Sequence, residues 1–202
     1  GTTAKDFSLG AHNGTLTNGT TWDEPKCGKS SVHFDNVNDY VSVANHADFN
    51  FGSSTDFSIA AWIRTDAAGD GGVIVLKGPM SGTGVKRYLL QVKVSSGAGY
   101  ANFNIYDGTT TRSVGSTGRV DDSNWHHIAV TVDRDGYAKI YVDGSYSTQA
   151  SVNGVGNIDN TDPVKIGGDG TSTYDFNGEI DEVRIYNRIL TSTEIQTLYN
   201  AE

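Results

Sequence analysis

The chain has 202 residues with 25 glycines and only 3 prolines; 19% of the residues are charged, and the formal net charge is −9. This length suits one all-β domain with a large core, and the single cysteine, Cys27, excludes an intramolecular disulfide. Nucleic acid and acidic membrane surfaces are bound through clustered Lys and Arg, so we expect neither as a partner of this acidic chain.

Alternating apolar and polar residues run from about residue 30 to residue 186 and predict a series of short strands. The clearest expected strands are Ser58–Arg64, Val73–Lys77, Lys86–Val94, Tyr100–Tyr106, Trp125–Asp133 and Tyr137–Val142. Asp107-Gly108, Asp135-Gly136 and Asp143-Gly144 stand at expected tight turns, because both residue types tolerate the positive φ of a two-residue hairpin. We expect largely antiparallel sheets in one domain over residues 1–202, which looks like a piece of a larger multidomain protein.

Alternation within three of these strands separates core residues from residues of the opposite face. The expected core residues are Ala101, Phe103, Ile105, Ile128, Val130, Val132, Ala138, Ile140 and Val142. The expected outward residues are Tyr100, Asn102, Asn104, Tyr106, Tyr137, Lys139 and Tyr141. His126 and His127 are adjacent and point to opposite faces, so they cannot chelate one metal ion together, and we interpret both as structural.

Exposed tyrosines beside amide side chains suit a sugar ligand. Aromatic rings pack on the apolar faces of pyranose rings, and amides offer both donors and acceptors to hydroxyl groups. Two loops add further candidates, one over residues 81–88 with cationic and aromatic side chains and one over residues 170–175 with a tyrosine. The predicted carbohydrate-binding residues are Arg87, Tyr88, Tyr100, Asn102, Asn104, Tyr106 and Tyr174. The alternative is that these strands are simply rich in tyrosine, as strands often are.

The end of the chain changes from a strand pattern to a helix pattern. Thr191 and Glu194 have the spacing of a capping box, in which each side chain bonds the backbone N–H of the other residue. Ile195 and either Leu198 or Tyr199 then fall on one face of the helix. The sequence therefore predicts one short C-terminal helix packed on the sheets.

Six segments resemble, in the right order, the landmarks of the laminin-G-like, concanavalin A-like domains. They are Asp6–Leu16, Val32–Val41, Phe57–Ile63, Asn124–Asp133, Ile140–Gly144 and Phe176–Leu190. The resemblance extends along almost the whole chain. It implies an antiparallel β-sandwich jelly roll with one short C-terminal helix.

The resemblance implies several functions, because such domains occur as carbohydrate-binding modules of polysaccharide-degrading enzymes, and also in adhesins and other surface proteins. With the tyrosine stripe and the lack of disulfides, we expect a non-catalytic polysaccharide-binding module of a secreted bacterial enzyme, covalently linked to a catalytic domain. The alternative is a cell-surface adhesion module that binds protein, which predicts a large contiguous apolar patch.

Many relatives carry a calcium ion that ties the N-terminal segment to the C-terminal strand. Calcium takes about six to eight oxygen ligands. Asp6 and Asn13 lie in a glycine-containing loop, Asp35 ends a predicted strand, and Asp181 shares the face of Val183 on a regular strand. We expect these four polar residues to bind a structural Ca²⁺. The alternative for Asp181 is hydrogen bonding to backbone amides or to an arginine.

Residues Glu179, Asp181 and Val183 match in part the Glu-x-Asp-x-Glu strand of family 16 glycoside hydrolases. Retaining glycosidases need two carboxyl groups about 5–5.5 Å apart. The third place is Val183 on a regular strand, or Arg184 on a bulged one, and neither side chain can act as the acid/base. A glycoside hydrolase or polysaccharide lyase is therefore the least favoured function, and we predict no catalytic residues.

Overall fold

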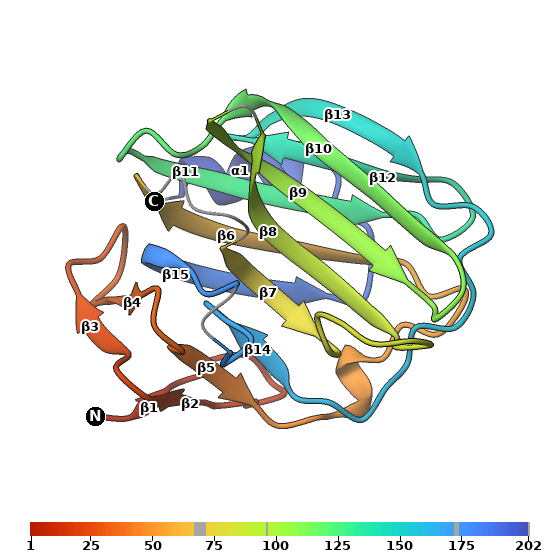
Figure 1. Cartoon of the computed structure of the whole chain (residues 1–202). Coiled ribbons are helices and arrows are strands. Elements are labelled where there is room, and N and C mark those ends of the chain that lie inside the picture. Colours follow the sequence, from red (N-terminus) through yellow and green to blue (C-terminus); the bar gives the residue numbers. More distant parts are fainter. Residues whose placement is uncertain (67–71, 96, 172–173, 202) are drawn as a thin grey trace.

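A computed structural model describes residues 1–66, 72–95, 97–171 and 174–201 of the chain. Its strands form two antiparallel sheets packed face to face (Figure 1). The eight-stranded sheet has the order β1-β2-β5-β14-β7-β8-β9-β10, and the seven-stranded sheet has the order β13-β12-β11-β6-β15-β4-β3. The strands are β1 (Thr3–Ala4), β2 (Gly14–Thr17), β3 (Thr21–Asp23), β4 (Ser31–Asp35), β5 (Tyr40–Val43), β6 (Phe57–Arg64), β7 (Val73–Lys77), β8 (Arg87–Ser95), β9 (Ala98–Tyr106), β10 (Thr111–Arg119), β11 (Trp125–Val132), β12 (Tyr137–Val142), β13 (Ser145–Ser151), β14 (Val164–Ile166) and β15 (Asn177–Tyr186). A short 3-10 helix, η1 (Ala47–Phe49), and one α-helix, α1 (Ser192–Asn200), complete the described elements.

The main core lies between the two sheets and is built by strand alternation. Phe57 of the seven-stranded sheet stacks on Phe51 with ring centroids 4.2 Å apart and contacts Phe103 of the opposite sheet at 6.1 Å. The nine predicted core residues of β9, β11 and β12 all pack in this core. Fully burying one such side chain contributes about 1.5–3 kcal/mol, so continuous packing of this kind favours the sandwich. The predicted β-sandwich is confirmed.

The predicted strands and turns are confirmed, with one difference in turn conformation. Asp143 and Gly144 have φ values of +51° and +73°, as a two-residue hairpin requires, and Gly108 has a φ of +98°. Asp135 and Gly136 do not have positive φ values. Their turn is closed instead by a hydrogen bond from Gly136 N–H to the carbonyl of Asp133, so here the hairpin was predicted correctly and its conformation was not.

Helix α1 covers the outer face of the seven-stranded sheet. The predicted capping box is confirmed, because Thr191 Oγ1 accepts from Glu194 N–H at 3.2 Å and Glu194 Oε2 accepts from Thr191 N–H at 2.8 Å. Ile195 is fully buried in a second small core together with Tyr141. Tyr141 is only 7% exposed, so the prediction that it points into solvent is wrong, because the helix covers its face. No helix in the described part of the chain has the length and apolarity needed to span a membrane.

Strand β15 contains a bulge that changes which residues share a face. Asp181 pairs with Trp62 and Arg184 pairs with Ala60, so two residues of β15 stand opposite one residue of β6. Glu182, at the bulge, has a φ of +48°. Val183 packs against the main core, whereas Asp181 lies with Trp62 on the outer face. The prediction that Asp181 shares the face of Val183 is therefore wrong, and the bulged alternative is the one that the strand adopts.

Candidate functional site

The outer face of β8, β9 and β10 carries many polar and aromatic side chains. Because Ala101, Phe103 and Ile105 of β9 are completely buried, alternation turns the intervening residues outward. Cross-strand pairing then aligns Arg87 with Tyr106, and Gln91 with Asn102. We call this set the polar grid; it consists of Arg87, Gln91, Lys93, Tyr100, Asn102, Asn104, Tyr106, Thr111 and Ser113.

The two asparagines of the polar grid are fixed by their neighbours on both sides. Asn104 Oδ1 accepts from Arg87 Nε at 3.2 Å, and Asn104 Nδ2 donates to Thr111 Oγ1 at 2.9 Å. Asn102 Oδ1 accepts from Gln91 Nε2 at 3.3 Å, while Asn102 Nδ2 donates to the carbonyl of Val114 at 3.2 Å. These bonds hold the carboxamides in defined orientations, so a ligand meets a preformed array of donors and acceptors.

Arg87 joins the polar grid to the neighbouring turn. One of its terminal nitrogens, Nη1, donates to the carbonyl of Met80 at 2.8 Å, and the guanidinium carbon lies 5.4 Å from the ring centroid of Tyr106. The Tyr106 hydroxyl donates to the carbonyl of Gly108 at 2.9 Å. A cation over a tyrosine ring is favourable, so Arg87 supports both the ring and the turn.

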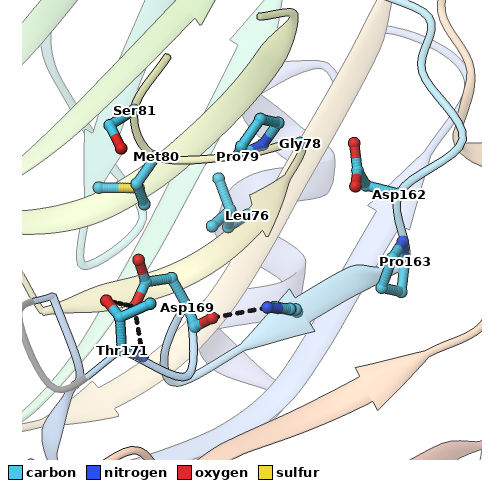
Figure 2. A pocket seen from close by; sticks show the side chains of 10 residues that line it. Leu76, Gly78, Pro79, Met80, Ser81, Asp162, Pro163, Asp169 and Thr171 are labelled. Carbon is cyan, nitrogen blue, oxygen red and sulfur yellow. Dashed lines mark hydrogen bonds between the residues drawn. The ribbon is translucent and has the colours of Figure 1, made fainter.

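A groove with a volume of about 370 Å³ lies beside the polar grid, along β7 and β14 (Figure 2). Its lining residues are Leu76, Gly78, Pro79, Met80, Ser81, Asp162, Pro163, Lys165, Asp169 and Thr171. Figure 2 shows Leu76 between the turn that carries Met80 and the loop that carries Asp169. Lys165 Nζ donates to the carbonyl of Asp169 at 2.6 Å, and the Asp169 carboxylate accepts from Thr171 N–H at 2.9 Å. The groove thus combines an apolar floor with polar walls, as sugar and other small-ligand sites do.

The structure brings most of the predicted sugar-binding residues to this face. Arg87, Asn102, Asn104 and the tyrosines of β9 belong to the polar grid. Tyr174 and Met80 pack beside it, against the small cluster of Val73, Leu76 and Leu89. Tyr88 is the exception and is corrected here. Its side chain is 1% exposed in the main core, and its hydroxyl donates to the carbonyl of Phe49 at 3.3 Å. Since Arg87 faces outward on β8, the next residue must face inward.

Some parts of this face were not predicted. Gln91, Lys93, Thr111 and Ser113 join the polar grid through the pairing of β8 and β10 with β9. Gln91 and Lys93 lie four and six residues after Arg87, so alternation places all three on one face, and this was the available signal. Within the predicted loop over residues 170–175, Ser172 and Thr173 lie outside the described residues.

The four residues predicted to bind calcium lie in three separate hydrogen-bond networks. Asn13 Oδ1 accepts from Asp6 N–H at 3.0 Å, and the Asp6 carboxylate accepts from Ser8 N–H at 2.8 Å and from His12 N–H at 2.7 Å. These bonds, those to Ser8 in particular, lower the pKa of Asp6 despite partial desolvation. The oxygens of Asp6 and Asn13 are thus already used to shape their own loop.

Asp35 and Asp181 have different surroundings from each other. Asp35 lies beside the fully buried Asp39, whose pKa is raised by burial and by the neighbouring Asp35 carboxylate. Asp181 Oδ2 accepts from the backbone N–H groups of Lys26 and Cys27 at 3.1 and 3.2 Å. Asp181 thus has the backbone hydrogen bonds that were the alternative to calcium binding for this residue. The adjacent carboxylates of Asp35 and Asp39, in contrast, fit a cation.

Several polar residues on or beside the seven-stranded sheet are paired with each other. Glu179 accepts from Arg64 Nε at 2.9 Å, and Arg184 stands in the place where a glycosidase strand carries its third acid. His126 contacts Asp122 and Asp143 at 3.0 and 2.9 Å. These residues therefore do not present two free, convergent acids.

The amino-acid sequence matches a known family model and two characterised proteins. Residues 35–196 match the family model described as the concanavalin A-like lectin/glucanases superfamily. The chain is 24% identical to paraclostridial mosquitocidal protein 1 of Paraclostridium bifermentans over 185 residues, which covers 82% of the chain and 14% of that protein. It is 26% identical to adhesion G-protein coupled receptor V1 of Danio rerio over 149 residues, which covers 72% of the chain and 2% of the receptor. The chain thus spans a small part of either relative.

Several solved structures with the same fold are toxin binding domains. The binding domain of paraclostridial mosquitocidal protein 1 superposes with a TM-score of 0.78 at 20% identity, covering 98% of this chain and 49% of that one. The botulinum neurotoxin serotype D ligand binding domain in complex with N-acetylneuraminic acid gives 0.70 at 13% identity, covering 96% and 47%. The botulinum neurotoxin DC binding domain in complex with rat synaptotagmin II gives 0.68 at 13% identity, covering 96% and 48%.

Proposed function

Since the chain belongs to the concanavalin A-like lectin/glucanase superfamily, we propose that it is a non-catalytic carbohydrate-binding module whose polar grid contacts the glycan. The observation that carries the proposal is the fixed array of Asn102 and Asn104 between Tyr100 and Tyr106 on one exposed sheet face. A pyranose ring packs on a tyrosine face, and the carboxamides bond its hydroxyls. Arg87 gives the same face a preference for anionic sugars.

The proposal includes a parent protein that is secreted by a bacterium and carries a catalytic domain. The relatives that are toxins and receptors agree with an extracellular setting. The non-catalytic part of the proposal is supported by Arg184 in the third acid position and by the pairing of Glu179 with Arg64.

A panel of immobilised polysaccharides and sialylated oligosaccharides tests the proposal with the untagged protein. We expect selective, saturable binding that is weakened by Tyr106→Ala and Asn104→Ala. Tyr137→Ala is the matched control. Tyr137 also lies on a strand and is 47% exposed, but its strand belongs to the other sheet. Binding lost equally in all three variants, or binding to no glycan, would contradict the proposal.

We further propose that calcium has a structural role, with Asp35 and Asp39 as the residues that fit it best. Two close carboxylates, one of them fully buried, repel each other unless a proton or a cation intervenes. Differential scanning calorimetry with calcium and with chelator tests this idea. A rise in Tm with calcium that Asp35→Asn abolishes is expected, and an unchanged Tm would remove calcium from the proposal.

A protein partner is the second candidate function, and one observation favours it. Phe7 and Leu9 project fully into solvent from the loop between β1 and β2, although their loop is closely hydrogen-bonded at its base. Exposed apolar side chains are typical of protein contacts when they form a patch, and Phe7 and Leu9 lie on the same loop. If no glycan binds, the variant pair Phe7→Ser and Leu9→Ser is the tool with which to test a candidate protein partner.

A further inference from the structure

Two segments that are far apart in sequence bring three metal-ligating side chains together. His12 comes from the loop between β1 and β2, whereas His46 and Asp48 come from the start of η1. The ligand atoms of the three residues lie within 4.8 Å of one another. Asp48 Oδ2 is 2.8 Å from His12 Nε2 and 3.3 Å from His46 Nδ1, and the two imidazole centroids are 4.5 Å apart.

The backbone and the core hold this cluster in place. His12 N–H donates to Asp6 Oδ2 at 2.7 Å, and the His12 ring contacts Phe49 edge-on at a centroid distance of 5.0 Å. Phe49 is itself buried, so the His12 ring rests on the core. His46 caps η1 by accepting from Asp48 N–H at 3.3 Å, a long bond that a metal ion can replace at little cost.

The ligand set selects a transition metal rather than calcium. Two imidazoles and one carboxylate match Zn²⁺ and similar ions, whereas calcium prefers oxygen ligands alone. Tetrahedral ligands at about 2.0–2.2 Å from zinc lie roughly 3.3 Å from each other. The two separations from Asp48 Oδ2, 2.8 and 3.3 Å, are close to this value, and all three ligand atoms lie within 4.8 Å of one another. The Asp48 and His46 side chains are 59% and 52% exposed, which leaves space for a water molecule as a fourth ligand.

Charge also favours this cluster over the other similar one among the described residues. Asp23, His33 and Glu179 lie within ligand distance of one another, but Glu179 is bound to the guanidinium of Arg64 at 2.9 Å. That cation opposes a second positive charge.

We propose that His12, His46 and Asp48 form a binding site for Zn²⁺ or a similar divalent transition-metal ion, which ties the loop between β1 and β2 to η1. The ion connects the body of the sandwich to the loop that carries the exposed side chains of Phe7 and Leu9. Metal binding thus fixes the base of that loop.

Isothermal titration of untagged, metal-stripped protein with ZnCl₂ tests the site, with Co²⁺ absorption as a direct report on ligand geometry. We expect one ion per chain and a Co²⁺ spectrum typical of tetrahedral coordination. Binding should weaken more than about tenfold in His12→Gln and in Asp48→Asn, since loss of even an outer-shell partner costs that much. His33→Gln is the matched control and should bind normally.

A second variant keeps all three ligands and changes only the space around one of them. A Cβ at position 10 would lie 2.7 Å from His12 Nε2, so Gly10→Ala displaces the ring and should also weaken binding. Circular dichroism without metal verifies that each variant folds. No saturable Zn²⁺ binding by the unmodified protein, or binding that His12→Gln and Asp48→Asn leave unchanged, would overturn the proposal.

Discussion

The outer faces of the two sheets have similar sequence patterns but differ in how far their side chains are exposed to solvent. On β9, alternation gives the half-exposed polar grid residues from Tyr100 to Tyr106. On β12, the same alternation gives Tyr137, Lys139 and Tyr141, but Tyr141 is buried because α1 and Leu190 pack on it. Strand alternation therefore decides which way a side chain points, and the elements packed on the sheet decide whether it reaches solvent.

The largest expected effect comes from uncovering the helix-covered face. Ile195→Ala removes a fully buried side chain of the second core and should lower the free energy of unfolding by about 2–5 kcal/mol. Chemical denaturation measures this change. Ile189→Ala is the matched control, because Ile189 is 38% exposed, and its effect should stay within about 0.5 kcal/mol. Equal effects of the two variants would mean that α1 does not stabilise this face.

Acid should weaken the covered face through His127. Burial lowers the pKa of His127 to about 4, so this imidazole stays neutral in the fold at pH values where the unfolded chain binds a proton. Stability conferred by the neutral group is complete above pH 6.5 and falls towards pH 4, by about 3 kcal/mol over that window.

Denaturation at pH 7 and pH 4 measures the effect as a difference between variants. In His127→Gln this part of the pH dependence should be absent, while His33→Gln should retain it, since the His33 side chain is 37% exposed. Parallel pH profiles for the unmodified protein and His127→Gln would show that the imidazole binds a proton as readily in the fold as in the unfolded chain.

The exposed face should respond in affinity rather than in stability. Tyr106→Ala removes a ring from the polar grid and should weaken glycan binding about tenfold, equivalent to about 1.4 kcal/mol. Tyr137→Ala, on the other sheet, should change affinity less than about twofold. Surface plasmon resonance with the glycan identified by the panel measures both. A larger loss in Tyr137→Ala would move the site to the seven-stranded sheet.

The smallest effect is expected at the helix cap. Thr191→Ala removes the side-chain acceptor for Glu194 N–H and should lower the free energy of unfolding by about 1 kcal/mol. Thr193→Ala, at the second residue of the helix, serves as the control. Urea denaturation distinguishes them, and a cap variant as stable as the control would show that tertiary contacts alone position α1.

Sequence reasoning predicted what depends on periodic patterns. The six strands, the capping box and most of the polar grid follow from alternation and local turn chemistry, whereas the sandwich was expected from the resemblance to laminin-G-like domains. Tyr88 was selected for its chemistry together with Arg87, although alternation places only one of two adjacent residues on a given face. Asp181 was misplaced because the single bulge at Glu182 reverses the alternation that follows, and no local pattern announces it.

The remaining features depend on contacts between distant segments. His12 and Asp48 are 36 residues apart, and only the packing of the first loop against η1 makes them neighbours. The groove beside β7 likewise combines the turn after β7 with the segments on either side of β14. Neither arrangement has a spacing rule that could be read along the chain, so both became visible only in three dimensions.

The bond from Arg87 to the Met80 carbonyl has a kinetic consequence. A long side chain that is free in the unliganded state loses conformational entropy when a ligand arrives, about 0.5–1.5 kcal/mol for each such side chain. Arg87 is already immobilised between Asn104 and Met80, so a ligand on the polar grid does not have to order it. Loss of the bond between Arg87 and the Met80 carbonyl would also loosen the turn that carries Met80 at the groove. We therefore expect Arg87 substitutions to shorten ligand residence time more than they slow association.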